Sequence, residues 1–337
     1  MAGGTARGAR PKLRLAARIL AGVAGLVLVG VIVLAVVPSS SGGLVSRPDP
    51  AAGYAESMSR FAAVRARERR RVHEPCKSRL LQHGRRTAVA VVLVHGLTNC
   101  PRQFVEFGRL LHSTGANVLI LRVPHHGLAD TTTRAIGGVG NVGGLTAGRL
   151  RAYADEAVDI ARGLGRDVRV LGLSMGGVVS AWIAQHRDDV ARAVVVAPAL
   201  TLPRMPDVVD YVFVNLFGRL PDVSLPGSSA LTHAYAGEST RALAEMYRLS
   251  RSVRASAAND APAVASIALV TNANDDQVDN GDVRALGEAW RRLGADVQEY
   301  EFPRRLGLRH DLIDVQQPDA RPELVYPVLA GLLGFGG

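Results

Sequence analysis

Residues 168–184 read V-R-V-L-G-L-S-M-G-G-V-V-S-A-W-I-A. The first six residues have the apolar character of a buried strand, and the last ten have the pattern of a helix. Between them stands Ser174, flanked by Gly172 and Gly176 in the pattern G-x-S-x-G. After a strand and before a helix, this pattern is typical of a sharp turn that exposes a serine hydroxyl as a nucleophile. The two glycines are expected there because larger side chains would collide where strand and helix approach.

Apolar β-rich runs alternate with helical patterns on both sides of this turn. Several of the runs are continuously apolar, which is typical of parallel strands covered by helices on both faces of a sheet. The sequence therefore predicts an α/β fold with a doubly wound, mostly parallel sheet. The expected strands are 88–95, 117–123, 168–173, 193–197, 267–272 and 297–302, and the expected helices are 102–114, 147–163, 176–187, 280–293 and 321–334.

The alternation of strands and helices breaks between Pro198 and Pro262. This segment is too long for an ordinary connection and too regularly patterned for disorder. We expect it to form a helical cap, at about 199–261, over the carboxyl edge of the sheet.

A serine hydroxyl becomes a good nucleophile only when a base removes its proton, so a histidine and an orienting carboxylate are required. His310 is the one histidine after His233, and it lies in a predicted loop between the last strand and the last helix. The carboxylate is expected at the end of the preceding strand, where Asp275 and Asp276 both qualify. We prefer Asp275, because an apolar residue three positions later would hold its turn, and Asp276 remains the alternative.

An oxyanion formed by attack on a carbonyl needs donors, which are usually backbone amides. The amide of Met175 follows the nucleophile directly, and the amide of Leu97 lies in the loop after the first core strand. These two amides are the expected oxyanion hole. His95 is interpreted as a structural residue that fixes this loop, and the segment R-V-P-H-H-G (122–127) as a turn in the pocket wall.

Residues 19–38 form an uncharged apolar run that, as a helix, would be about 30 Å long and match the core of a bilayer. Basic residues precede it, which predicts a cytoplasmic N-terminus and an exported remainder. An uncleaved anchor is favoured over a cleaved signal peptide, because no clear A-x-A-like site follows. The expected organisation is a basic cytoplasmic tail (1–18), a transmembrane helix or signal segment (19–38), a linker and juxtamembrane segment (39–70) and one folded domain (71–337).

Composition and cysteine usage narrow the possible partners. The formal net charge is +10, but much of the excess lies in the N-terminal tail, and no basic stripe interleaved with aromatic residues suggests nucleic-acid binding. The two cysteines, Cys76 and Cys100, are expected to pair outside the cytoplasm, with two unpaired thiols as the alternative. The sequence has neither a metal-ligand set nor a dinucleotide fingerprint, so no metal and no cofactor is expected.

The segments V-H-G-L-T, R-V-P-H-H-G, G-L-S-M-G-G, N-D-D-Q-V and R-H-D-L-I-D together resemble the α/β-hydrolase superfamily, and within it the esterase and monoacylglycerol-lipase-like branch. The resemblance covers about residues 88–335. It implies Ser174 as nucleophile, His310 as base, Asp275 as its partner and the cap as a lid over the acyl site. The order Ser, Asp, His also agrees with that family.

This resemblance implies a serine hydrolase that cleaves carboxylic esters through an acyl-enzyme. The apolar stretch D-V-V-D-Y-V-F-V-N-L-F-G (207–218) would favour lipid-like or medium-chain acyl esters if it lines the acyl pocket, although such a stretch is as often packing. The expected partners are a small-molecule or lipid ester and a membrane. An acyltransferase with the same triad, and a catalytically silent membrane-tethered binding protein on this scaffold, are the alternatives.

Overall fold

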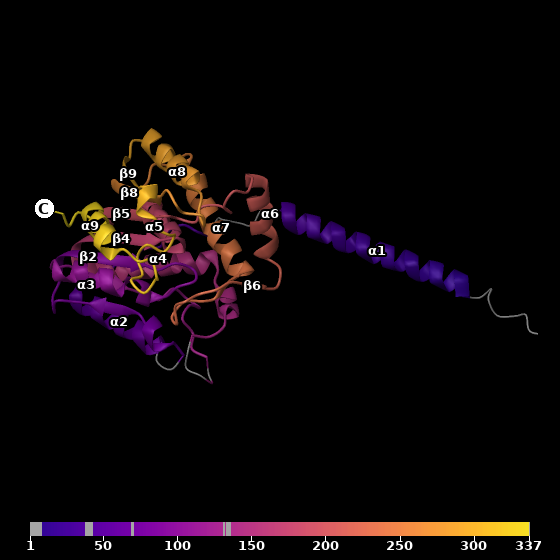
Figure 1. The fold of residues 1–337 in the computed structure, drawn as a ribbon, viewed down its shortest axis with the longest axis horizontal. Coiled ribbons are helices and arrows are strands. Elements are labelled where there is room, and N and C mark those ends of the chain that lie inside the picture. The colour runs from indigo at the N-terminus through magenta and orange to yellow at the C-terminus, as the bar shows by residue number, and fades with distance from the viewer. Residues whose placement is uncertain (1–8, 38–42, 69–70, 131, 133–135, 337) are drawn as a thin grey trace, which may run out of the picture.

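The computed structural model describes residues 9–37, 43–68, 71–130, 132 and 136–336. Part of the expected tail (1–8) and both ends of the expected linker (38–42 and 69–70) therefore lie outside the described residues. The body of the molecule is a layered α/β domain, from which one long helix extends to the side (Figure 1).

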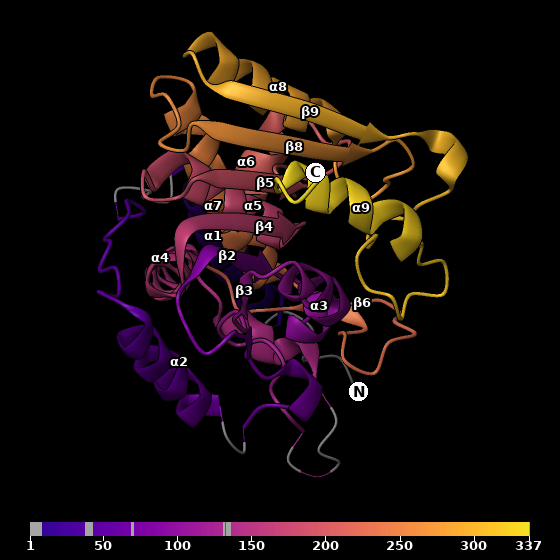
Figure 2. The same cartoon turned by 90° about the vertical axis from the view of Figure 1, so that its left-hand side faces the viewer.

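In the described part of the chain, a seven-stranded sheet forms the centre of this domain, in the order β1-β3-β2-β4-β5-β8-β9 (Figure 2). All neighbours run parallel except β1, which pairs antiparallel with β3 at one edge. The predicted doubly wound, mostly parallel sheet is confirmed. The strands are β1 (Arg79–Leu81), β2 (Thr87–Val94), β3 (Asn117–Ile120), β4 (Gly165–Leu173), β5 (Arg192–Val196), β8 (Ser266–Asn272) and β9 (Asp296–Phe302).

The register of the sheet brings several loops to one edge. Val94 at the end of β2 pairs with Gly172 in β4, and Leu173 pairs with Val196 at the end of β5. Because the strands are parallel, the segments that follow β2, β4 and β5 emerge together at the carboxyl edge, which is where ligands bind in open α/β sheets.

Helices cover both faces of the sheet, as the continuous apolar strands require. Helices α4, α5 and α8 lie on one face, where the Trp290 indole N–H of α8 donates to the Gln185 side chain of α5 at 2.7 Å. Helices α3 and α9 lie on the other face, joined by a ring contact between Phe107 and Tyr326. The helices are α3 (Val105–Ser113), α4 (Ala147–Leu164), α5 (Met175–His186), α8 (Asn280–Arg292) and α9 (Pro322–Leu332), with 3-10 turns at Glu74–Cys76, Pro101–Phe104, Val139–Gly144 and Arg304–Leu306.

The insert between β5 and β8 is not purely helical, and this corrects the expected cap. It contains α6 (Asp207–Phe217), a small antiparallel pair formed by β6 (Ser224–Pro226) and β7 (Gly237–Ser239), and α7 (Thr240–Ala257). Helix α7 packs on α4 and α5 and buries Leu249 and Val253, so it belongs to the body of the domain. The small sheet could not be predicted, because each of its strands has only three residues and includes Gly, Ser or Pro.

Helix α1 (Ala9–Val36) projects away from the domain beside α6 (Figure 1). Its segment Leu15–Val36 is long and apolar enough to cross a membrane, as an anchor or a signal sequence. Side chains of α6 and of the residues after it bind the last carbonyls of α1. Arg219 donates to the carbonyl oxygens of Leu34 at 2.7 Å and Val37 at 2.8 Å, and Asn215 donates to that of Ala35 at 3.1 Å. Carbonyls that a helix end leaves unsatisfied are thus bound by the folded domain.

The folded domain begins earlier than residue 71, and this corrects the expected linker. Residues 54–68 form α2 (Tyr54–Glu68), which packs against α4, and the hydroxyl of the fully buried Ser57 donates to the carbonyl oxygen of Ile160 at 2.6 Å. Upstream of α2, the Ser46 hydroxyl donates to Asp155 at 2.6 Å. Residues 46–49 of the expected linker are therefore bound to α4, through Asp155 and Asp159.

Cys76 and Cys100 form a disulfide, which confirms the expected pairing. Both residues are fully buried, and they pack with Val72 in a small apolar cluster of their own. The bond joins the segment before β1 to the loop after β2, directly upstream of the turn that carries Gln103.

Candidate active site

Ser174 occupies a strained turn at the carboxyl end of β4. Its backbone φ is 60° and its ψ is −116°, a conformation that costs about 1–3 kcal/mol for a residue other than glycine. A Cβ at Gly172 would lie 2.0 Å from the carbonyl oxygen of Gly176, and a Cβ at Gly176 would lie 2.0 Å from that of Val94. Only glycine therefore fits at either position, so the turn can hold the serine above the sheet edge.

His310 and Asp275 meet at the same edge. The Nδ1 atom of His310 lies 2.7 Å from Oδ2 of Asp275, and the Asp275 side chain is fully buried. Its other oxygen, Oδ1, accepts the amides of Gln277 at 2.9 Å and Val278 at 3.3 Å. Asp276 is exposed, and among the described residues it makes no hydrogen bond or ion pair. The structure thus brings Asp275, the preferred acid, to His310.

Asn272 fixes the loop that carries the histidine, and sequence reasoning missed it. This fully buried side chain, the last residue of β8, donates to the carbonyl oxygens of Leu308 at 2.9 Å and Arg309 at 3.1 Å. The backbone immediately before His310 is thereby held to the end of the strand that precedes Asp275. An asparagine that ends an otherwise apolar strand was the signal in the sequence that could have indicated this role.

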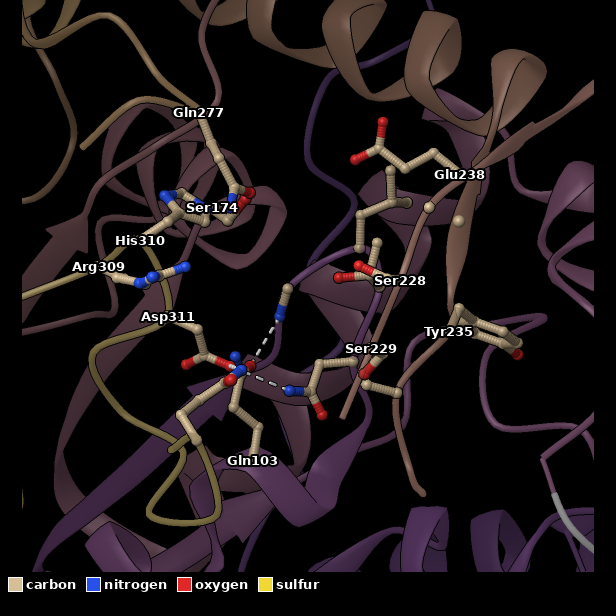
Figure 3. Close-up of a pocket in the computed structure, with 18 of the residues that line it drawn as sticks. Gln103, Ser174, Ser228, Ser229, Tyr235, Glu238, Gln277, Arg309, His310 and Asp311 are labelled. Carbon is tan, nitrogen blue, oxygen red and sulfur yellow. Dashed lines mark hydrogen bonds between the residues drawn. The ribbon is translucent and has the colours of Figure 1, made fainter. Parts of the chain in front are cut away.

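Ser174 and His310 line one cavity of about 390 Å³ (Figure 3). The described residues show no hydrogen bond between the Ser174 hydroxyl and the His310 ring. The imidazole uses Nδ1 for Asp275, so Nε2 is the atom available to a proton from the cavity side.

The loop after β2 brings the amide of Leu97 to this cavity. Its carbonyl oxygen lies 2.7 Å from Nε2 of His126, and the preceding amide, that of Gly96, donates to the Gln103 side chain at 2.9 Å. The described turns and loops contain no hydrogen bond that uses the amides of Leu97 or Met175. Leu97 lines the cavity, whereas Met175, at the start of α5, follows the lining residue Ser174 and is itself fully buried.

Two buried histidines support this loop. In the fully buried His95, Nδ1 lies 2.8 Å from the Gly96 carbonyl oxygen and Nε2 accepts the Val123 amide at 3.1 Å, an arrangement that agrees with the expected structural role. Burial holds the pKa of His95 well below its usual range and lowers the pKa of His126 to about 4. Both rings are therefore neutral near pH 7, and His126 belongs to the expected turn at 122–127, beside the cavity.

A second histidine–aspartate pair joins the insert to the loop after β2 and to the loop that contains His310. His233 in the insert lies 2.6 Å from Asp314, and Asn99 in the loop after β2 donates to the same carboxylate at 3.3 Å. Burial is the largest influence and by itself raises the pKa of Asp314, but the hydrogen bond and charge of His233, with the hydrogen bonds from the Gln316 amide and the Asn99 side chain, together lower it. The hydroxyl of Tyr235 accepts the Gly127 amide at 2.8 Å. The stretch 233–235 is thus fixed between the loop after β2 and the loop that contains His310.

The cavity lining is mostly polar, and this corrects the expectation that residues 207–218 line an apolar acyl pocket. The insert contributes residues 225–230, 234, 235, 237 and 238 instead, while α6 lies against α1. Val208 of α6 remains 66% exposed on the outer surface. Besides Ser174 and His310, the polar side chains that line the cavity are Thr98, Asn99, Gln103, Ser228, Ser229, Tyr235, Glu238, Gln277, Arg309, Asp311, Gln317 and Asp319.

The comparisons with known proteins agree with this architecture. The family model described as the alpha/beta hydrolase family matches residues 91–322. The chain belongs to the alpha/beta hydrolase family. A search of curated proteins finds no match to this hydrolase.

Several solved structures share the fold of this hydrolase. A structure reported for LipS and LipT, two metagenome-derived lipolytic enzymes, has a TM-score of 0.57 at 18% identity and covers 79% of this chain and 100% of its own. The monoacylglycerol lipase of Paleococcus ferrophilus has a TM-score of 0.53 at 17% identity, with 77% of this chain and 98% of its own covered. A soluble variant of monoglyceride lipase from Saccharomyces cerevisiae has a TM-score of 0.50 at 10% identity, and the match covers 74% of this chain and 87% of the lipase chain.

Proposed function

We propose that this hydrolase is a serine esterase that cleaves carboxylic esters through an acyl-enzyme. The observation that carries the proposal is the buried pair of His310 and Asp275, 2.7 Å apart, beside the cavity into which a strained turn presents Ser174. A neutral imidazole whose Nδ1–H is held by a carboxylate has Nε2 ready to accept a proton, as the chemistry of an activated serine requires.

The reaction follows from these positions. His310 removes the proton of Ser174 as the serine oxygen attacks the ester carbonyl, and Asp275 stabilises the imidazolium that forms. The amides of Leu97 and Met175 donate to the oxyanion, and collapse of the intermediate expels the alcohol, which takes the proton from His310. Water then repeats the sequence, so the acid is released and the serine is restored.

The same proposal places the enzyme at a membrane, with its folded domain outside the cytoplasm. Three observations support this: the apolar segment Leu15–Val36, the basic residues before it, and the buried disulfide, since disulfides persist in oxidising compartments. The hydrogen bonds from Asn215 and Arg219 to the end of α1 favour an anchor that stays attached over a signal that is removed.

The test uses the full chain in detergent with p-nitrophenyl acetate, butyrate and octanoate. We expect Ser174→Ala to lower kcat/KM by at least about 10³-fold and to abolish labelling by a fluorophosphonate probe. Ser180→Ala, which removes a buried hydroxyl in α5 that has no hydrogen-bond partner, serves as the matched control. Wild-type protein that is folded but neither labels nor hydrolyses any of the three esters would contradict the proposal.

A further inference from the structure

Glu238 is a carboxylate inside the cavity that the proposed reaction does not use. It lies in β7 and pairs in register with Leu225 of β6, and both residues line the cavity. Its side chain points into the cavity from the side of the insert, separated from Ser174 by open space (Figure 3). The insert therefore places a charged group opposite the reacting centre, at a position that the rest of a bound ester would reach.

Among the described residues, Glu238 differs from the other charged groups of the cavity because it has no hydrogen-bond or ion-pair partner. Asp311 accepts a hydrogen bond from Asn99 at 3.2 Å, and Asp319 pairs with Arg309 at 3.0 Å. In the described part of the chain, the Glu238 carboxylate makes no hydrogen bond and no ion pair. Burial raises the pKa of its carboxyl group, and the charge of His310 partly offsets that effect. A partly desolvated carboxylate of this kind gains most from a cationic ligand.

The charge balance of the cavity points the same way. Its lining includes three carboxylates, those of Glu238, Asp311 and Asp319, and one guanidinium, that of Arg309. The chain as a whole carries a formal net charge of +10, so this concentration of negative charge is local. Arg309 pairs with Asp319, so the carboxylates of Glu238 and Asp311 remain without an arginine or lysine partner in the cavity lining.

We propose that this cavity selects esters that carry a positively charged ammonium group, and that Glu238 is the residue that binds that group. The inference rests on the proposed esterase activity and adds to it the substrate class. A quaternary or alkyl ammonium group would contact the Glu238 carboxylate while Ser174 attacks the carbonyl, and the hydroxyl-bearing Ser228 and Ser229 would line the path between them. Anionic esters would be repelled by the same groups.

The experiment compares pairs of substrates that have the same shape and differ in charge, with the full chain in detergent at low salt. One pair places the charge in the leaving group, S-butyrylthiocholine against 3,3-dimethylbutyl thiobutyrate. The other places it in the acyl group, p-nitrophenyl 4-(trimethylammonio)butyrate against p-nitrophenyl 5,5-dimethylhexanoate. We expect kcat/KM to favour the cationic member of at least one pair by about tenfold, and the preference to shrink as salt is added.

Glu238→Gln should reduce that preference to within about twofold of unity, while kcat/KM for the neutral esters changes little. Glu288→Gln, which alters an exposed glutamate on α8, is the matched control and should retain the preference. If Glu238 acts only through the charge of His310, Glu238→Gln will lower kcat/KM equally for the cationic and the neutral ester of a pair. Either that result or the absence of a preference in both wild-type pairs would overturn the inference.

Binding separates failure of this inference from failure of the proposed function. Calorimetry on the Ser174→Ala chain would compare choline with 3,3-dimethylbutan-1-ol, its uncharged analogue. Tighter binding of choline that Glu238→Gln abolishes, found while the wild-type chain hydrolyses none of the esters, would support the ammonium site and contradict the proposed reaction. Equal binding of the two alcohols would contradict the ammonium site whether or not esters are cleaved.

Discussion

Replacement of Asp275 by asparagine separates the two candidate acids and tests the reaction. Oδ2 of Asp275 lies 2.7 Å from Nδ1 of His310, so during attack a full negative charge stands beside the imidazolium. Two unit charges about 4 Å apart interact by about 4 kcal/mol at the effective dielectric constant of about 20 that suits protein sites, which corresponds to about 10³-fold in rate. The asparagine amide would also donate a hydrogen bond to Nδ1 and so favour the tautomer that carries its proton on Nε2, so a loss between about 10³-fold and 10⁴-fold in kcat is expected.

The assay is the initial rate of p-nitrophenyl butyrate hydrolysis by the full chain, with Asp276→Asn as the matched control. Asparagine keeps an Oδ1 that can accept the amides of Gln277 and Val278, so the turn should survive, and circular dichroism would verify the fold. Asp276 is exposed, so its variant should stay within about threefold of wild type. A damaging Asp276→Asn, or an Asp275→Asn rate within tenfold of wild type, would refute the assignment.

Three further changes test the supports of the site. The double variant Cys76→Ser with Cys100→Ser removes a crosslink with a sequence separation of 24. Chemical denaturation should show that the free energy of unfolding falls by about 3 kcal/mol. An unchanged denaturation midpoint would mean that the disulfide adds no stability. Asn272→Ala removes the hydrogen bonds that hold the backbone before His310, so kcat should fall by about tenfold or more while KM changes little. An unaltered kcat would show that other contacts hold the loop. Burial lowers the pKa of His126 to about 4, so below the unfolded pKa of about 6.5 the unfolded chain binds a proton that the native state does not. The free energy of unfolding should therefore fall by up to about 3 kcal/mol from pH 6.5 to pH 4. If the free energy of unfolding falls equally steeply with pH in His126→Gln, His126 is not the origin of the effect.

The sheet could be predicted because its parallel strands are continuous apolar runs. The six expected strands appear within a few residues of their predicted bounds, and the five expected helices between them appear as well. Strand β1 could not be predicted, because it has three residues, includes Arg79 and pairs only at the edge. Length and continuity of the apolar pattern therefore decided which elements the sequence revealed.

A site residue could be predicted only where both its type and its position relative to a strand or helix are typical of a known catalytic role. A serine at a strand-to-helix turn, a late histidine and an aspartate after a strand meet that condition. Glu238, in the plain sequence G-E-S, does not, because its position over the cavity depends on the fold of the whole insert. The apolar stretch of α6 was misinterpreted for a related reason: a hydrophobic helix face shows that something covers it, not whether that partner is a ligand or another helix.

The contact between Trp182 and Leu44 sets a limit on how the soluble part of this enzyme can be produced. The Trp182 indole N–H donates to the Leu44 carbonyl oxygen at 2.8 Å, and Trp182 lies in the helix that Ser174 opens. A truncation that begins at residue 45 would remove α1 but would also leave a buried indole donor without its acceptor, in the second turn of that helix. A protein that begins at residue 43 keeps the hydrogen bond between Trp182 and Leu44, so a loss of activity in it would report on the missing α1 and on its contacts with Asn215 and Arg219.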